Sequence, residues 1–200
     1  MAGRPRAPGA DAAIMAAALA LLRDSGYAGL TLDDVAALAG VGKSSLYRRF
    51  RDRADLATAA IASAQRALPE PAGDLRADLI AYLRAVDADL GRVGLGVIAS
   101  LLGHDPDTLA LYRARVIEPR ARHSRQLLHN ARQRGQIRPD ADLDAAMELL
   151  IGSLFTRALT GDRSPRPWPE RAVDTLLDGL RTPPETAEPV AGVPTCCDGG

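Results

Sequence analysis

The segment from Ala39 to Phe50, AGVGKSSLYRRF, gathers side chains that can donate hydrogen bonds to phosphates and base edges. It holds the only lysine of the chain, Lys43, with two serines, a tyrosine and two arginines. A lysine can donate to guanine acceptors, and serine hydroxyls can bond bases or phosphates. Free N–H groups at a helix start also favour a phosphate. The segment therefore has the chemistry of a nucleic-acid contact.

Basic residues concentrate at this point although the chain as a whole is neutral, with 25 basic and 25 acidic residues. From Lys43 to Arg53 there are five basic residues and one acid, Asp52, which is a local charge of +4. A patch of this kind is the electrostatic footprint of a nucleic-acid-binding surface. The alternative interpretation is a solvated helix face whose serines only cap the helix.

The surrounding residues predict two short helices joined by a tight turn. Thr31 and Asp34 have the spacing of a capping box, so a helix should begin there and end at Gly40. A second helix fits from about 42 to 50, with Leu46 on its buried face. These two helices position the polar segment, because Lys43 falls at the start of the second one.

The turn follows the steric rules of a helix-turn-helix unit. Small Ala36 lets the second helix approach, and Gly40 takes the left-handed turn. Val41 and Leu46 fill the angle between the two helices. In such a unit the second helix enters the major groove with its N-terminal residues toward the base edges. The spacing therefore predicts a DNA-reading helix that begins at Lys43.

Composition favours a globular all-α protein. The chain has 200 residues, 46% of them hydrophobic but only 4% aromatic, and runs of β-branched residues are almost absent. Apolar periodicity predicts about nine helices, at approximately 11–25, 31–39, 42–50, 53–67, 75–90, 97–102, 106–134, 142–161 and 169–181. The expected parts are a disordered basic arm (1–10), a helix-turn-helix domain (11–68), a C-terminal helical bundle (69–181) and a disordered tail (182–200).

Proline and aspartate residues mark expected features of individual helices. Pro119 lies inside the long seventh helix and is expected to kink it, which makes it a candidate coupling point. Four aspartates stand at expected helix starts, where a carboxylate can accept from free N–H groups: Asp11, Asp52, Asp105 and Asp142.

The two ends of the chain bear on its location. Arg4 and Arg6 before an apolar run also suit a secretory signal, but no small-x-small cleavage site follows. No run approaches the ~20 apolar residues of a membrane span. Cys196 and Cys197 are adjacent and cannot form a disulfide framework, so a reducing cytoplasm is expected.

The stretch TLDDVAALAGVGKSSLYRRFRDRADL, preceded by DSGYAG, resembles the DNA-binding domain of the tetracycline-repressor (TetR) family of transcriptional regulators. The resemblance covers roughly residues 14–60 and implies an all-α homodimer that binds operator DNA and a small molecule. Gly42 stands where the family often has Ser or Thr as N-cap, and Gly caps nearly as well. By position, the DNA contacts that the resemblance implies are Thr31, Lys43, Ser44, Ser45, Tyr47, Arg48 and Arg53. Arg49 is added as a candidate DNA contact because it belongs to the basic patch.

The C-terminal half, including RQLLHNARQRGQIRPDADLDAAMELLIGSLFTRAL, is similar to a class of TetR effector domains. In the family the last two long helices form a four-helix bundle across a two-fold axis. That implies dimer contacts here at Ile151, Leu154, Phe155, Leu176 and Leu180. The alternative is a helix pair buried within one chain.

An effector pocket is expected among the fifth to eighth helices. The candidates are polar side chains on otherwise apolar stripes, and each is alternatively an ordinary buried polar residue: Tyr82, His104, Tyr112 and His123.

Signals of enzyme chemistry are missing from the sequence. The three histidines lack paired metal spacing, and neither a nucleophile elbow nor a phosphate-binding glycine loop is found. No catalytic residue, metal or cofactor is predicted. The resemblance to the TetR family implies a ligand-released repressor on a pseudo-palindromic operator. The alternative is a small-molecule carrier whose helix-turn-helix does not read DNA.

Overall fold

The computed structural model describes residues 9–161 and 167–180, and every regular element in these ranges is helical. The arginines of the N-terminal arm and the two cysteines of the tail lie outside the described residues. The elements are α1 (Ala10–Gly29), α2 (Leu32–Leu38), α3 (Lys43–Tyr47), α4 (Arg53–Ser63), α5 (Leu75–Val93), α6 (Leu95–Leu102), α7 (Pro106–Tyr112), η1 (Arg113–Ile117), α8 (Glu118–Gln133), α9 (Leu143–Thr160) and α10 (Trp168–Leu180). Because α7, η1 and α8 run on without a break, the described part has nine separate helices, and the all-α prediction is confirmed.

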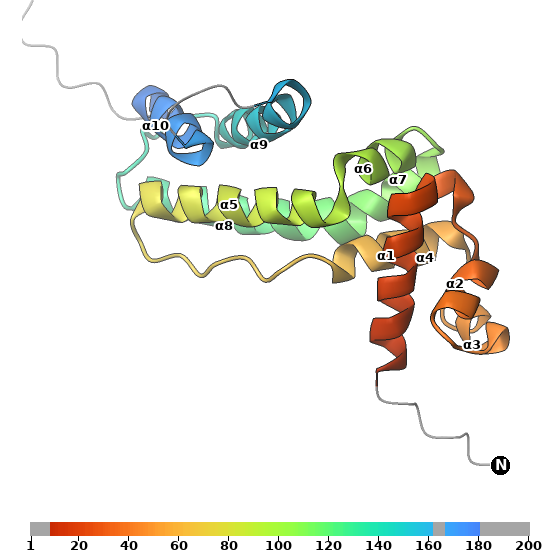
Figure 1. The fold of residues 1–200 in the computed structure, drawn as a ribbon. Coiled ribbons are helices and arrows are strands. Elements are labelled where there is room, and N and C mark those ends of the chain that lie inside the picture. Colours follow the sequence, from red (N-terminus) through yellow and green to blue (C-terminus); the bar gives the residue numbers. More distant parts are fainter. Residues whose placement is uncertain (1–8, 162–166, 181–200) are drawn as a thin grey trace, which may run out of the picture.

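Two long antiparallel helices form the body of the molecule, α5 and the α7–η1–α8 helix (Figure 1). Helices α9 and α10 pack beside each other on one side of this pair. Helices α1 to α4 lie at the end of the pair where α6 and α7 contact α1 and α4. The short helices α2 and α3 project from that end beside α1, which leaves one side of α3 open to solvent.

Three of the four predicted aspartate caps are present in the structure. Asp52, Asp105 and Asp142 each accept a hydrogen bond from the backbone N–H three residues on, as expected. Asp11 is not a cap, because α1 begins one residue earlier with Gly9 at the N-cap position. Gly26 ends the regular part of α1 as predicted, since its φ of 69° lies in the left-handed region.

Helix α4 is shorter than the sequence predicted, since it ends at Ser63 rather than near Ala67. The residues that follow α4 leave the helix because they pack on α5 and α8. There the Arg66 backbone N–H donates to Asp89 at 3.2 Å. A tertiary contact has therefore replaced the helical hydrogen bonds that the local sequence favoured.

The hydrophobic core consists of two clusters. One unites the faces of α1 to α4 with α6, α7 and η1, including Leu22, Leu46 and Tyr112. The other joins α5, α8, α9 and α10, including Leu83 and Leu128. The division of the core therefore does not follow the boundary expected near residue 69, because α6 and α7 pack on the N-terminal helices.

The long central helix contains a π-helical turn, η1, directly before Pro119. The Glu118 N–H donates to the Arg113 carbonyl five residues back, so the turn is wider than an α-helical one. Proline has no N–H, and its ring would clash with the carbonyl four residues back in a regular helix. The wide turn accommodates the proline, where the sequence predicted only a kink.

Candidate DNA-binding surface and ligand cavity

The turn between α2 and α3 has the helix-turn-helix geometry that the sequence indicated. Gly40 has φ 66°, and the Val41 N–H donates to the Ala36 carbonyl at 3.0 Å. Leu46 is fully buried under the turn. Gly42 is the N-cap of α3 with extended backbone, so the first N–H groups of α3 have no side-chain cap. Unpaired N–H groups at a helix start suit a phosphate oxygen.

Lys43 and Tyr47 lie together on the exposed side of α3 and share one carboxylate of α2. Lys43 Nζ donates to Asp33 Oδ2 at 2.6 Å, and the Tyr47 hydroxyl donates to Asp33 Oδ1 at 3.2 Å. The hydrogen bond with Asp33 raises the pKa of Lys43, and the same bond lowers the pKa of Asp33. The pair is exposed and therefore weak, so a phosphate or base acceptor can replace Asp33.

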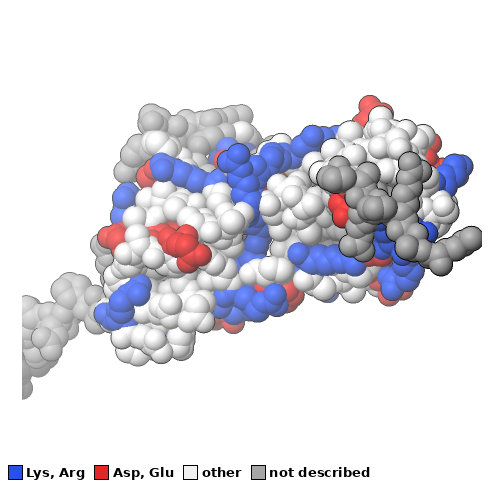
Figure 2. All heavy atoms as spheres, turned by 90° about the horizontal axis from the view of Figure 1, so that it is seen from below, with Lys and Arg blue, Asp and Glu red and all other residues white. Residues whose placement is uncertain are grey.

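The other basic residues of the segment are largely engaged within the chain. Arg49 pairs with Asp11 of α1, and Arg51 with Asp52 at 2.9 Å. Arg53 donates to the Ala28 carbonyl at 3.0 Å. Asp33 and Asp11, which lie outside the segment, therefore offset part of its local charge of +4. Figure 2 shows basic and acidic side chains interspersed on the face of the molecule seen from below.

The remaining predicted DNA contacts differ in accessibility. Arg48 and Ser44 are exposed, and Ser45 is half-buried. Thr31 is exposed but acts as the N-cap of α2, accepting from the Asp34 N–H at 3.1 Å. The residues best placed for a partner are thus Lys43 and Ser44 at the start of α3 and Arg48 at its end.

A cavity of about 150 Å³ lies between α4, α5, the long central helix and α9. Its walls are mainly apolar, with Val86 and Leu90 from α5 and Val116 from η1. Two of the four predicted ligand residues, Tyr82 and Tyr112, line it. Burial raises the pKa of both phenols, which therefore stay protonated near neutral pH and can donate hydrogen bonds.

The structure brings only one of the two predicted histidines near this cavity. The His123 ring stacks on Tyr82 with 6.1 Å between ring centroids, although His123 is not itself a lining residue. His104 lies elsewhere, because it follows α6 and faces α1. Its ring packs on Tyr27 at 4.7 Å, and its Nε2 is 3.0 Å from Arg53 Nη2. His104 therefore contacts α1 and Arg53 rather than the cavity.

Two charged residues line the cavity that the sequence analysis did not single out, Asp89 and Arg120. Their exposed fractions are 4% and 8%, and they form an ion pair. Asp89 also pairs with Arg92 and accepts from the Arg66 N–H. The sequence signal for these two cavity residues was a charged side chain on the apolar stripe of its helix, α5 for Asp89 and α8 for Arg120. That signal was missed because arginine and aspartate are common throughout the chain.

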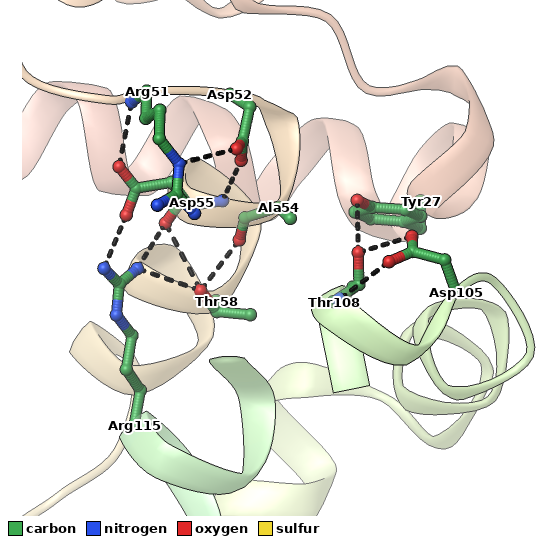
Figure 3. A network of polar contacts seen from close by, with 9 residues as sticks. All are labelled: Tyr27, Arg51, Asp52, Ala54, Asp55, Thr58, Asp105, Thr108 and Arg115. Atoms are coloured by element: carbon green, nitrogen blue, oxygen red, sulfur yellow. Dashed lines mark hydrogen bonds and ion pairs between the residues drawn. The ribbon is translucent and has the colours of Figure 1, made fainter. Parts of the chain in front are cut away.

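A network of polar contacts connects the cavity wall to the N-terminal helices (Figure 3). Arg115 of η1 donates to the Asp55 carboxylate at 2.5 Å, the Asp55 carbonyl at 2.7 Å and the Thr58 hydroxyl at 3.0 Å. Burial pushes the pKa of Asp55 up, but hydrogen bonds from the Arg51 N–H and Arg115 outweigh it and leave that pKa lowered. Asp55 is therefore ionised at neutral pH.

A second contact in Figure 3 lies nearer the end of α1. The hydroxyls of Tyr27 and Thr108 are 3.0 Å apart, and Asp105 accepts from the Thr108 hydroxyl at 2.7 Å. The Tyr27 N–H also donates to Ser100 of α6 at 3.2 Å. The N-terminal helices are thus held on α6, α7 and η1 at several points.

The five residues predicted at the dimer contact lie in two separate places in the structure. Ile151, Leu154 and Phe155 line the cavity inside the chain, and Leu154 is 1% exposed. A dimer contact at these three positions stays a prediction, because Ile151 and Phe155 are only partly buried in the single chain. Periodicity could not separate the two cases, because a core face and a partner face are both apolar. Leu176 and Leu180 instead line an open groove between α9 and α10.

That groove has the apolar and small side chains of a contact surface. It is lined by Leu149, Gly152 and Thr156 of α9 and by Ala172 and Gly179 of α10, among others. Leu149 is 68% exposed in the single chain. A large exposed leucine beside small residues is typical of a surface that another protein covers.

Together these features define an all-α protein with an N-terminal helix-turn-helix unit and a C-terminal helical domain that encloses a small cavity. The family model described as "Bacterial regulatory proteins, tetR family" matches residues 14–60. The model "Tetracyclin repressor-like, C-terminal domain" matches residues 69–178. The chain belongs to the TetR family of helix-turn-helix transcriptional regulators.

Relatives agree with this assignment. The chain is 31% identical over 166 residues to the uncharacterized HTH-type transcriptional regulator YdeS of Bacillus subtilis, covering 80% of this chain and 84% of that protein. It is 30% identical over 174 residues to the regulator Rv1556 of Mycobacterium tuberculosis, with 85% of each covered. The solved structure of the TetR family transcription regulator SCO0332 is 33% identical with a TM-score of 0.64, covering 87% of this chain and 100% of that chain.

Two features are absent from the part of the chain that the structure describes. None of the helices within residues 9–161 and 167–180 is long and apolar enough to cross a membrane. Within the same ranges, histidine, cysteine, aspartate and glutamate do not gather in groups of three or more that could hold a metal ion.

Proposed function

We propose that this regulator is a cytoplasmic repressor that binds a pseudo-palindromic operator as a homodimer and is released by a small molecule. The observation that carries the proposal is the position of the cavity. Ile61 of α4 and Gln65 just after it line the cavity together with the residues of the C-terminal domain. A ligand there would touch the helix that connects the DNA-binding unit to the rest of the protein.

DNA recognition is assigned to the start of α3. Lys43 and Ser44 are exposed there beside the uncapped N–H groups. Arg48 is exposed at the C-cap of the same short helix. Lys43 can donate to guanine, while Ser44 and the backbone can hold a phosphate. Arg49 and Arg53 are proposed to support the unit from within, since both are bonded to other parts of the chain.

Ligand release is expected to act through the contacts that hold α4. Arg115 lies on the same π-helical turn as Val116 and Ile117, which line the cavity. A ligand that moves this turn also moves the partner of Asp55 in α4. The operator is released only if the ligand prefers the arrangement in which the two reading helices do not fit the operator, because coupling requires a difference in affinity.

Replacing both Lys43 and Arg48 by Gln tests the DNA-binding assignment. We expect weaker binding to every duplex, and a slope of log affinity against log salt that is smaller by about 1 for each phosphate that the variant no longer neutralises. Fluorescence anisotropy over a salt series, on the duplex upstream of the protein's own gene and on a scrambled duplex, measures both. Replacing the exposed Arg122 and Arg134 of the C-terminal domain by Gln is the matched control. An unchanged salt slope in the Lys43 and Arg48 variant would favour the carrier alternative.

Dimerisation is proposed to use the groove between α9 and α10. A Leu149→Glu variant places a charge on this surface, and we expect it to sediment as a monomer. Operator affinity should fall by on the order of 100-fold, because the two half-sites are then bound independently. The control is Leu102→Glu, which alters an exposed leucine of α6. A Leu149→Glu protein that remains dimeric in analytical ultracentrifugation would place the interface elsewhere.

A further inference from the structure

The buried guanidinium of Arg120 is only partly satisfied by the protein. Arg120 Nη2 donates to Asp89 Oδ2 and, at 3.5 Å, to the Arg66 carbonyl. Its Nε and Nη1 are buried and have no hydrogen-bond partner among the described residues. Leaving charged donors buried and unpaired is costly, so a site of this kind gains free energy from an acceptor.

The charge around Arg120 points to an anionic acceptor. Asp89 is shared between two guanidinium groups, those of Arg120 and Arg92. The two guanidinium groups and the one carboxylate together therefore carry a net charge of +1. A neutral acceptor could satisfy the hydrogen bonds of Arg120 but would leave this charge. A carboxylate would bring a hydrogen-bond acceptor and a balancing negative charge together.

The size and walls of the cavity limit the rest of the ligand. A volume of about 150 Å³ matches that of an apolar protein cavity known to bind benzene. The side chains of Val86, Leu90 and Phe155 offer apolar contact, and the phenols of Tyr82 and Tyr112 add polar edges. A single aromatic ring or a short branched chain fits this space.

We propose that the cavity binds a compact organic acid, with an apolar body of about one aromatic ring and a carboxylate that bonds to Arg120. This assignment rests on the proposed function only in treating the cavity as the effector site. The carboxylate competes with Asp89 for the guanidinium. Because Asp89 also holds the Arg66 backbone N–H just after α4, the same competition loosens an anchor of the DNA-binding unit.

Calorimetric titration of the full-length protein with benzoate, benzamide and toluene tests the proposal. Benzoate carries the charge, benzamide is its neutral isostere, and toluene reports on the cavity alone. We expect benzoate to bind at least tenfold more tightly than benzamide, and an Arg120→Met variant to lose this preference while still binding toluene. If Arg120→Met does not fold, Asp89→Asn with Arg120→Met removes both charges and gives the same comparison.

Two results would overturn the proposal: binding of toluene without a preference for benzoate over benzamide, or binding of none of the three. A benzoate preference that survives in the Arg120 variants would also overturn it, since another group would then hold the carboxylate. Operator binding is measured separately by anisotropy with and without benzoate. If benzoate binds through Arg120 but leaves operator affinity unchanged, the acid site stands and the release step of the proposed function fails.

Discussion

An Asp89→Ala variant is expected to lose about 3–5 kcal/mol of unfolding free energy, the usual cost of leaving one partner of a buried ion pair behind. Asp89 accepts from Arg120, Arg92 and the Arg66 N–H while being almost fully buried. Its removal leaves the Arg120 guanidinium without a counter-charge in the core. Arg92 is less affected, because its side chain is 32% exposed and can turn to water. Urea unfolding followed by circular dichroism measures the loss.

Two comparisons separate this effect from the simple loss of a carboxylate. Asp140→Ala removes the exposed partner of Arg138 and should change stability by less than about 1 kcal/mol. Replacing Asp89 by Asn and Arg120 by Met together should recover most of the loss, since no buried charge remains. If Asp89→Ala costs no more than Asp140→Ala, water reaches Arg120 freely and the cavity is not a low-dielectric site.

Local signals were enough to predict much of the N-terminal fold. Thr31 caps α2 through a residue three positions away, and Gly40 takes its turn because a side chain there would be strained. Both depend on neighbours in the chain, so the sequence contains them directly. The all-α fold and the family follow from such signals, and both predictions are confirmed.

The electrostatics of the reading unit could not be predicted in this way. Arg49 pairs with Asp11 from 38 residues away, and Lys43 pairs with Asp33 from 10 residues away. Counting charges along the segment therefore overstated its positive charge. Which apolar face of α9 meets the core is likewise a tertiary property. Leu149 and Leu150 are neighbours, yet the first is 68% exposed and the second is buried.

The coupling contacts of Figure 3 are also long-range, and one of them supports a prediction about DNA specificity. Arg115 reaches Asp55 across 60 residues and fixes α4 on the π-helical turn. A dimer reads two half-sites, so its specific affinity depends on holding two reading helices at one spacing. Non-specific binding depends mainly on phosphate charge and tolerates a looser arrangement. Loosening α4 should therefore reduce specificity before it reduces total DNA binding.

An Arg115→Met variant is accordingly expected to lower operator affinity about tenfold, which corresponds to about 1.4 kcal/mol, while affinity for a scrambled duplex changes little. The variant leaves the Asp55 carboxylate, whose side chain is 15% exposed, without its charged partner. Arg76→Met is the matched control, because it removes a bidentate ion pair with Asp174 inside the C-terminal domain. Anisotropy on both duplexes gives the ratio of affinities. Equal ratios for Arg115→Met and Arg76→Met would mean that the Arg115 contacts stabilise the chain without setting the position of the reading helix.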